Sequence, residues 1–183
     1  MRIAVLSLQG AFEEHRQMLL RLGADPFFVR ETADWKGRVD GLVLPGGEST
    51  AMVCQAQEGG LWQLLQERIA AGLPVFGTCA GMILLDRTHL NVMDIQARRN
   101  AYGRQLGSFR TVAPMKGLGE IPMTFIRAPY VEDYGDGVEV LAECGGRVVA
   151  VRQRNMLATA FHPELDGDPS VHRYFLQLAS GRE

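Results

Sequence analysis

The fold can be read outward from the stretch Val75-Phe76-Gly77-Thr78-Cys79-Ala80-Gly81-Met82. An apolar run at residues 73–76 precedes it and is typical of a buried strand, and the apolar residues 82–85 continue as a helix. A strand that turns into a helix at Gly-x-Cys-x-Gly is the thiol form of the nucleophile elbow, which lifts the central side chain out of the sheet. The two glycines permit the strained turn and the close backbone approach that it needs.

Cys79 is expected at the N-terminus of that helix, where the helix dipole favours a thiolate. The backbone N–H of Ala80, directly after it, is free to donate to an oxyanion. The alternative is a small cysteine buried in a tight turn, which is common. The pentapeptide alone leaves both interpretations open, so the rest of the chain has to decide between them.

Strands and helices alternate around the elbow in the first half of the chain. The expected strands are residues 3–8, 26–29, 39–44 and 73–76, and the expected helices are residues 11–22, 49–57 and 61–71. Apolar positions at helical spacing and the stop residues Gly23 and Gly72 define these helices. The alternation predicts a three-layer α/β fold, an open, mixed and mostly parallel sheet with helices on both faces.

The second half reads as short strands followed by one helix. The expected strands are residues 109–112, 124–126, 138–142, 148–152 and 157–161, and the helix is residues 171–178. Gly, Pro, Asn or Asp separates these runs, so we expect hairpins attached to the main sheet, notably around Gly145-Gly146. No internal repeat, linker or low-complexity segment divides the sequence, which predicts a single domain over residues 1–183.

Composition narrows the class of protein. A chain of 183 residues with 46% hydrophobic residues can bury a substantial core, and a net charge of −2 without a Lys/Arg block argues against a nucleic-acid binder. The three cysteines, Cys54, Cys79 and Cys144, are odd in number and widely spaced, so they suggest neither a disulfide framework nor a zinc site. No run is long enough to span a membrane, and the N-terminus lacks a signal pattern. We therefore expect a cytoplasmic protein without a metal or other cofactor.

A cysteine nucleophile needs a base, and the chain has four histidines. We interpret three of them as solvated or capping residues: His15, His89 and His172. His162 differs because it follows an expected strand and precedes Pro163-Glu164. Pro163 should hold His162 extended, so that Glu164 points the same way and binds one imidazole nitrogen while the other faces the thiol. This gives a nucleophile, a base and an orienting carboxylate, although a simple His-Pro turn remains the alternative.

A third motif, Pro45-Gly46-Gly47-Glu48-Ser49-Thr50, follows the expected strand 39–44. A Gly-Gly turn that opens a helix presents backbone N–H groups, which suits a second oxyanion donor. It is a poor phosphate loop because no Gly-Lys-Ser/Thr follows. Glu48 can complement the helix dipole or, in a substrate crevice, bind an ammonium group. Because this turn and the elbow both end parallel strands, we expect them to face one crevice.

These three motifs, in this order, resemble those of the triad-type (class I) glutamine amidotransferases. Other stretches are similar to the glutaminase subunits of pyridoxal 5'-phosphate (vitamin B6) synthase, the PdxT/SNO family. They are Leu8-Gln9-Gly10-Ala11, Arg99-Asn100-Ala101-Tyr102-Gly103-Arg104-Gln105, Ser108-Phe109, Phe125-Ile126-Arg127-Ala128-Pro129 and Phe161-His162-Pro163-Glu164-Leu165. The resemblance covers nearly the whole chain. It departs at residues 86–97, which are fewer than in the family, and at Tyr102, where the family usually has Phe.

The resemblance implies a flavodoxin-like class I glutamine amidotransferase fold and the hydrolysis of L-glutamine to glutamate and ammonia. By the family pattern Cys79 forms a glutamyl thioester, His162 carries the proton and Glu164 orients His162. Backbone N–H groups of Gly47 and Ala80 would hold the oxyanion. The glutamine pocket that the pattern implies consists of Gly47, Glu48, Ser49, Arg99, Ile126 and Arg127. The implied partner is a separate synthase subunit, which receives the ammonia in a hetero-oligomeric complex; no nucleic acid or membrane is expected.

Two alternatives remain open. The glutaminase subunit of another amidotransferase, such as the one in histidine biosynthesis, would share the triad but lack the Arg-Asn and Ile-Arg-Ala-Pro stretches. A non-enzymatic binding module on the same fold has no need to keep a complete triad.

A last expectation concerns regulation. Two consecutive glycines permit more than one peptide orientation at the Pro45-Gly46-Gly47 turn, so the isolated chain should be a poor glutaminase that docking activates. The resemblance also suggests that Gln9-Gly10 lies beside this turn.

Overall fold

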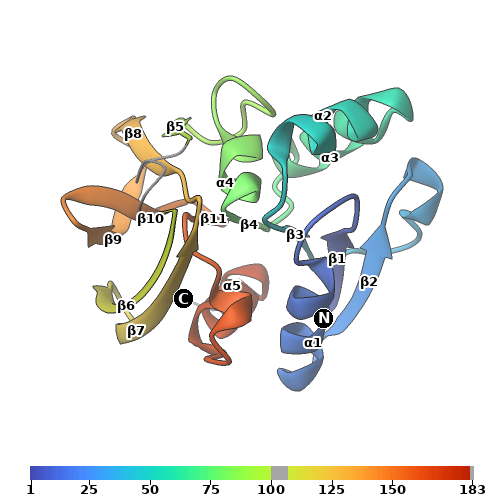
Figure 1. Cartoon of the computed structure of the whole chain (residues 1–183). Coiled ribbons are helices and arrows are strands. Elements are labelled where there is room, and N and C mark those ends of the chain that lie inside the picture. Colours follow the sequence, from blue (N-terminus) through green and yellow to red (C-terminus); the bar gives the residue numbers. More distant parts are fainter. Residues whose placement is uncertain (100–106, 182–183) are drawn as a thin grey trace.

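A nine-stranded mixed sheet forms the centre of the computed structural model, which describes residues 1–99 and 107–181 (Figure 1). Its parallel part has the order β2 (Asp25–Val29), β1 (Arg2–Leu6), β3 (Gly41–Leu44), β4 (Val75–Thr78) and β11 (Met156–Thr159). Antiparallel strands extend it through β10 (Arg147–Gln153) to β9 (Glu139–Cys144), β8 (Tyr130–Tyr134) and β5 (Ile95–Arg98). The predicted mixed α/β sheet is therefore confirmed.

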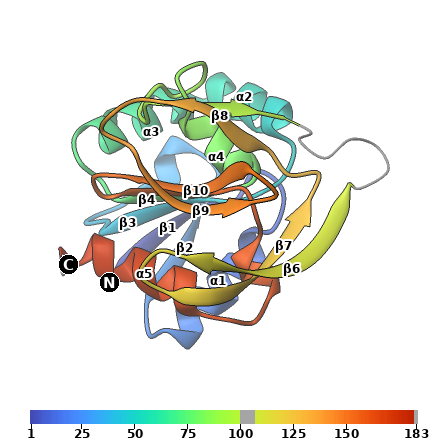
Figure 2. The ribbon, with the colours of Figure 1, turned by 90° about the vertical axis from the view of Figure 1, so that its left-hand side faces the viewer.

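Helices cover both faces of this sheet (Figures 1 and 2). One face carries α2 (Ser49–Glu58), α3 (Leu61–Ala70) and α4 (Ala80–Leu85), and the other carries α1 (Phe12–Arg21) and α5 (Ser170–Ala179). Two short 3-10 helices are η1 (Thr32–Asp34) and η2 (Pro163–Leu165). Each predicted helix is present, with no end shifted by more than two residues, and the three layers follow the prediction.

Burial on both faces explains why the central strands read as continuous apolar runs. Every residue of β3, β4 and β11 is buried, as expected for parallel strands that lie between two helix layers. Phe76 of β4 packs against Phe175 of α5 with 5.6 Å between ring centroids. Truncation of such a buried ring costs about 3–5 kcal/mol, so these strands are a rigid base for the loops at their ends.

Two parts of the second half differ from the prediction. The strands β6 (Ser108–Met115) and β7 (Gly119–Ile126) form a separate two-stranded sheet on the α5 side, not a hairpin of the main sheet (Figure 2). This hairpin packs inward through Phe125, whose ring centroid lies 5.8 Å from that of Phe161. The strands β5 and β8 were not predicted. They pair with each other at the sheet edge and are largely polar, so backbone pairing rather than an apolar pattern makes them strands.

A buried carboxylate organises residues 86–97, the segment that is short relative to the family. Asp86 is 1% exposed and accepts hydrogen bonds from the backbone N–H of Thr88 (2.8 Å) and of Ala97 (3.3 Å). Nδ1 of His89 lies 2.7 Å from the same carboxylate. Burial opposes the charge on Asp86, but the hydrogen bonds from His89 and Thr88 outweigh it and lower the pKa of Asp86. The short segment is thus tied down by one side chain.

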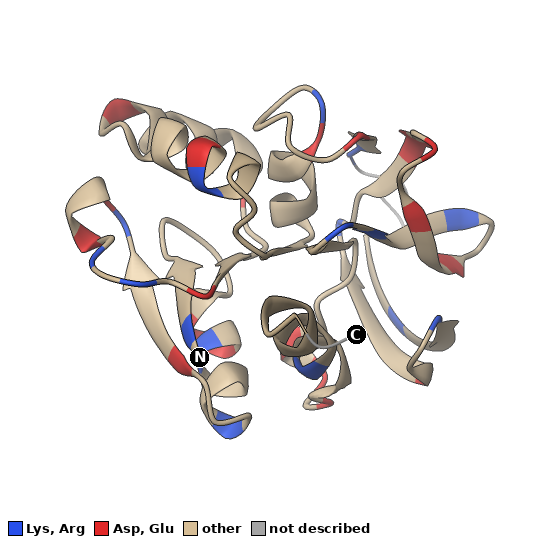
Figure 3. Cartoon of the chain, turned by 180° about the vertical axis from the view of Figure 1, so that it is seen from behind, with Lys and Arg blue, Asp and Glu red and all other residues tan. Residues whose placement is uncertain are grey.

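Charged residues of both signs are scattered over the outer helices and loops, while the central strands are mostly uncharged (Figure 3). Within residues 1–99 and 107–181, no helix has the length and the apolar character needed to cross a membrane.

Candidate active site

The turn from β4 into α4 is a strained elbow with Cys79 at its apex. Cys79 has φ 49° and ψ −103°, a backbone conformation that costs on the order of 1–3 kcal/mol for a residue with a Cβ atom. A Cβ atom at Gly77 would lie 2.6 Å from the backbone carbonyl of Gly81, and one at Gly81 would lie 1.9 Å from the carbonyl oxygen of Leu44. Both glycines are therefore required by close backbone contacts, as predicted.

His162 reaches the thiol from the loop that follows β11. Its side chain and that of Cys79 line the same cavity, and its Nδ1 lies 2.7 Å from Oε1 of Glu164. The predicted contact between His162 and Glu164 is confirmed, but the expected extended run is wrong. Pro163–Leu165 forms a 3-10 turn, so Glu164 reaches back to His162 across one tight turn.

The site holds His162 in its protonated form. Burial opposes the charge, but the hydrogen bond to Cys79 and the interaction with the Glu164 carboxylate outweigh burial and raise the pKa of His162 to about 10. The imidazolium therefore persists at neutral pH beside the Cys79 side chain. Thiolate and imidazolium side by side are the form in which a cysteine can attack without first losing a proton.

A second carboxylate fixes the segment that carries His162. The backbone N–H of His162 donates to the carbonyl of Thr124 on β7 at 2.8 Å. The side chain of Asp166 accepts from the backbone N–H (3.1 Å) and the hydroxyl (2.6 Å) of the same Thr124, and its Oδ1 lies 3.0 Å from Nε of Arg110. The hairpin β6–β7 is thereby locked to the turn that presents the base.

The Pro-Gly-Gly turn (residues 45–47) lies against the other side of the thiol. A Cβ atom at Gly46 would lie 2.3 Å from Cε1 of His162 and 3.4 Å from Cβ of Cys79. The backbone N–H of Gly46 donates to the hydroxyl of Thr78 (3.1 Å), and its carbonyl accepts from the N–H of Ala11 (3.3 Å). Gly10 also contacts this turn, so the suggested position of residues 9–10 beside it is confirmed.

A cavity of about 270 Å³ opens over these groups at the carboxyl ends of the parallel strands. Its described lining consists of Gly10, Ala11, Gly46, Gly47, Cys79, Ile126, Arg127, His162 and Leu165. The Pro-Gly-Gly turn and the elbow thus face one crevice, as predicted. Sequence reasoning had not placed Leu165 in this wall.

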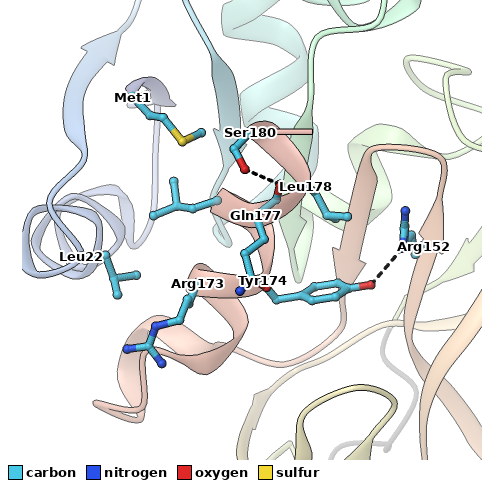
Figure 4. A pocket seen from close by; sticks show the side chains of 9 residues that line it. Met1, Leu22, Arg152, Arg173, Tyr174, Gln177, Leu178 and Ser180 are labelled. Carbon is cyan, nitrogen blue, oxygen red and sulfur yellow. Dashed lines mark hydrogen bonds between the residues drawn. The ribbon is translucent and has the colours of Figure 1, made fainter. Parts of the chain in front are cut away.

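A larger hollow, of about 810 Å³, lies beside α5 and Met1, before the start of β1 (Figure 4). Nη1 of Arg152 donates to the hydroxyl of Tyr174 there at 3.4 Å. Its described lining contains neither cysteine nor histidine, so it lacks the groups of the proposed chemistry.

The predicted glutamine-binding residues fall into two groups. Gly47, Ile126 and Arg127 line the cavity, whereas Glu48, Ser49 and Arg99 do not. Glu48 caps α2, since its carboxylate accepts from the N–H groups of two residues in the first turn at 3.1 Å and 2.8 Å, and these bonds lower the pKa of Glu48.

Of the two roles expected for Glu48, the structure shows the one in which its carboxylate complements the dipole of α2. Arg99 lies beside the same helix start, where its Nη1 donates to Thr50 at 3.1 Å, and Ser49 is buried. The rest of the Arg-Asn stretch, residues 100–105, lies outside the described residues.

The interpretation of His15 and His172 as solvated or capping residues is wrong. Both are fully buried, and Nδ1 of His15 lies 2.8 Å from Nε2 of His172. Helical spacing carried a signal for this, because His15 shares a helix face with Phe12 and Leu19. The two buried histidines lie directly behind the triad.

Comparisons with known proteins agree over almost the whole chain. The model of the SNO glutamine amidotransferase family matches residues 5–180. A Methanocorpusculum labreanum protein named pyridoxal 5'-phosphate synthase subunit PdxT is 54% identical over 187 aligned residues, which cover 99% of both chains. A Streptococcus pneumoniae protein of the same name is 47% identical and covers 97% of both chains. A crystal structure described as a glutamine amidotransferase is 44% identical, has a TM-score of 0.91 and covers 97% of this chain and 98% of its own.

Proposed function

The chain belongs to the SNO glutamine amidotransferase family, and we propose that it is the glutaminase subunit of a pyridoxal 5'-phosphate synthase. It hydrolyses L-glutamine to glutamate and ammonia, and the ammonia passes to the synthase subunit. The observation that carries this function is the arrangement of Cys79, His162 and Glu164 beneath a small cavity at the carboxyl ends of the parallel strands.

The first half of the reaction uses the thiolate and the imidazolium. Cys79 attacks the side-chain carbonyl carbon of glutamine, and a C–S bond forms. The N–H groups of Ala80 and Gly47 receive the negative charge on the carbonyl oxygen. The C–N bond then breaks while His162 gives its proton to the leaving nitrogen, which departs as ammonia and leaves a glutamyl thioester.

The second half regenerates the enzyme. His162 is now neutral and takes a proton from water, whose oxygen attacks the thioester carbonyl. The C–S bond breaks, glutamate leaves, and the thiolate–imidazolium pair is restored. Glu164 holds Nδ1 of His162 throughout, so that the other ring nitrogen stays directed at the reacting atoms.

The cavity supports a small amino acid as substrate. Arg127 lines it and supplies a guanidinium group for a carboxylate, while the exposed backbone of the Pro-Gly-Gly turn offers polar contacts. Glu48 and Arg99, at the start of α2, remain predicted contributors to the binding of the substrate's amino-acid end.

The proposed partner is the synthase subunit, and docking controls activity through the Pro-Gly-Gly turn. The carbonyl of Gly46 accepts from Ala11, and in a trans peptide the following N–H, that of Gly47, points the opposite way. The direction of this oxyanion donor is therefore linked to residues 9–11, in the loop between β1 and α1. A partner that contacts the crevice rim at these residues can therefore fix the direction of the Gly47 N–H. A cytoplasmic location, where thiols stay reduced, is part of the same proposal.

The test is ammonia release from L-glutamine by the purified chain, titrated with the synthase subunit. We expect weak hydrolysis alone and a large increase in kcat on docking, since one misdirected oxyanion donor costs on the order of 100-fold or more. Equal kcat/KM with and without the subunit would contradict the regulation. A stimulation that Gln9→Ala abolishes, while the complex still forms, would support it. Glutamine binding without any ammonia release, even in the complex, would favour the binding-module alternative.

A further inference from the structure

We propose that His15 is a positioning residue of this site: it holds the second oxygen of the Glu164 carboxylate and, through Thr78, connects it to the Pro-Gly-Gly turn. The inference deepens the proposed glutaminase function and rests on it for its kinetic consequences. It makes the triad the accessible end of a longer buried chain that runs from Cys79 to His172.

The two oxygens of Glu164 have different surroundings. Oε1 lies 2.7 Å from His162, while Oε2 is buried and makes no hydrogen bond in the described part of the chain. Nε2 of His15 faces this Oε2 at 3.5 Å, and both side chains are completely buried. An unpartnered carboxylate oxygen is costly in such a place, so a donor on His15 Nε2 is the group that stabilises it.

The neighbours of His15 select the tautomer that supplies this donor. Nδ1 of His15 lies 2.8 Å from Nε2 of His172. If His172 donates there, Nε2 of His15 carries a proton that faces both Oγ1 of Thr78 (3.0 Å) and Oε2 of Glu164 (3.5 Å). If His15 donates instead, its bare Nε2 can accept from the Thr78 hydroxyl but repels Oε2 of Glu164, and the Nδ1–H of His172 is buried without a described acceptor. The first arrangement satisfies more groups and is the one that we assign.

Both buried histidines act as neutral donors. Burial and the neighbouring His172 and His162 lower the pKa of His15 far below its usual range, and burial lowers the pKa of His172 to about 3. The groups that face His15 are Phe76, Thr78, His162, Glu164 and His172. A neutral donor fixes Glu164 without cancelling the negative charge that keeps His162 protonated.

The same imidazole reaches the oxyanion side of the site. Nε2 of His15 lies 3.0 Å from the hydroxyl of Thr78, which accepts the N–H of Gly46. Gly46 in turn packs against the ring of His162. Loss of His15 therefore loosens both the carboxylate and the Pro-Gly-Gly turn, which act in catalysis more than in ground-state binding of glutamine.

The experiment compares His15→Leu with His15→Gln in the complex with the synthase subunit, and uses His89→Leu as a histidine control outside the site. We expect His15→Leu to lower kcat by about 10- to 100-fold, the range seen for outer partners that orient metal-bound histidines, with little change in KM. His15→Gln keeps an amide donor and should recover most of the activity. Near-normal kcat in His15→Leu would overturn the proposal.

A double-variant cycle separates positioning from general damage to the fold. In a Glu164→Gln background, His15→Leu should add little, because the carboxylate that it positions is already gone. An equal loss in both backgrounds would show a merely structural role and overturn the proposal. If His15→Leu does not fold, His15→Asn replaces it, since its amide keeps a polar group in place but is too short to reach Glu164. Normal kcat in His15→Asn would count against the proposal.

A second readout needs no glutamine. The rate of Cys79 alkylation by iodoacetamide, measured against pH, reports the thiolate–imidazolium pair. We expect His15→Leu to shift its inflection upward and His89→Leu to leave it unchanged. If the inflection shifts but no variant, and not even the wild type, hydrolyses glutamine, the proposed function fails and the positioning role stands. If the wild type is active and neither kcat nor the inflection responds to His15→Leu, the positioning role fails alone.

Discussion

The two ends of the parallel strands carry two different hollows. The one at the carboxyl ends has about a third of the volume of the one beside α5 and Met1, 270 Å³ against 810 Å³. Only the smaller brings a cysteine, a histidine and the buried carboxylate behind it together within the described residues. Loops at the carboxyl ends of neighbouring parallel strands converge, whereas the described lining of the larger hollow is α5 together with Met1, the end of α1 at Leu22 and Arg152 of β10. Convergence of polar groups, and not size, marks the site.

The largest expected effect on turnover comes from comparing one variant in each of the two hollows. Cys79→Ala should abolish ammonia release in the complex, because Cys79 is the one thiol among the described residues that line the cavity. Tyr174→Phe in the larger hollow should leave kcat within about twofold. A glutamine-analogue electrophile should label Cys79 but neither Cys54 nor Cys144. Equal labelling of all three thiols, or turnover by Cys79→Ala, would contradict the assignment.

The next effect separates the members of the triad. His162→Asn should lower kcat by about three orders of magnitude or more, and Glu164→Gln should cost less because it disturbs orientation rather than proton transfer. The pKa of His162 is raised to about 10, so the imidazolium that supports the thiolate is present at every pH below that value. We therefore expect iodoacetamide to alkylate Cys79 faster at pH 6 in the wild type than in His162→Asn. Unchanged alkylation at pH 6 in that variant would point to another base.

The close backbone contact at Gly81 in the elbow should matter for the stability of the fold. Gly81→Ala places a Cβ atom 1.9 Å from a backbone oxygen and should lower the free energy of unfolding by about 3 kcal/mol. Gly59→Ala is the matched control, because a Cβ atom there meets nothing within 4 Å, and it should change stability by less than about 0.5 kcal/mol. Urea denaturation of both variants measures the difference. Equal stabilities would mean that the elbow tolerates a wider turn.

The smallest predicted effect concerns acid and the buried histidines. The pKa of His172 is lowered to about 3 in the folded state against about 6.5 unfolded, so acid protonates the unfolded chain first. This group should cost about 2 kcal/mol of stability between neutral pH and pH 5. His172→Gln cannot titrate and should lose less stability over that interval. Parallel curves of unfolding free energy against pH for the two proteins would argue that His172 is not buried as a neutral ring.

Sequence patterns predicted the parallel part of the sheet well and the edge poorly. Continuous apolar runs such as 39–44 and 73–76 follow from burial on both faces, and they appear as β3 and β4. The strands β5 and β8 have no such pattern, because their partners supply the stabilisation through the backbone. The 3-10 turn at Pro163–Leu165 was likewise missed, although the contact between His162 and Glu164 was predicted.

The sequence by itself determined the elbow and the side chains that end the central strands, because glycine spacing, apolar runs and order along the chain are local properties. Tertiary structure alone decided what lies behind them. His15 and His172 are 157 positions apart, and a polar residue on an apolar helix face does not reveal its partner until the helices pack on the sheet. The same holds for Glu48, which caps its own helix in this structure instead of lining the cavity. Local sequence pattern shows which side chains end the strands and helices. Which of those side chains contact one another is decided only when the helices pack on the sheet.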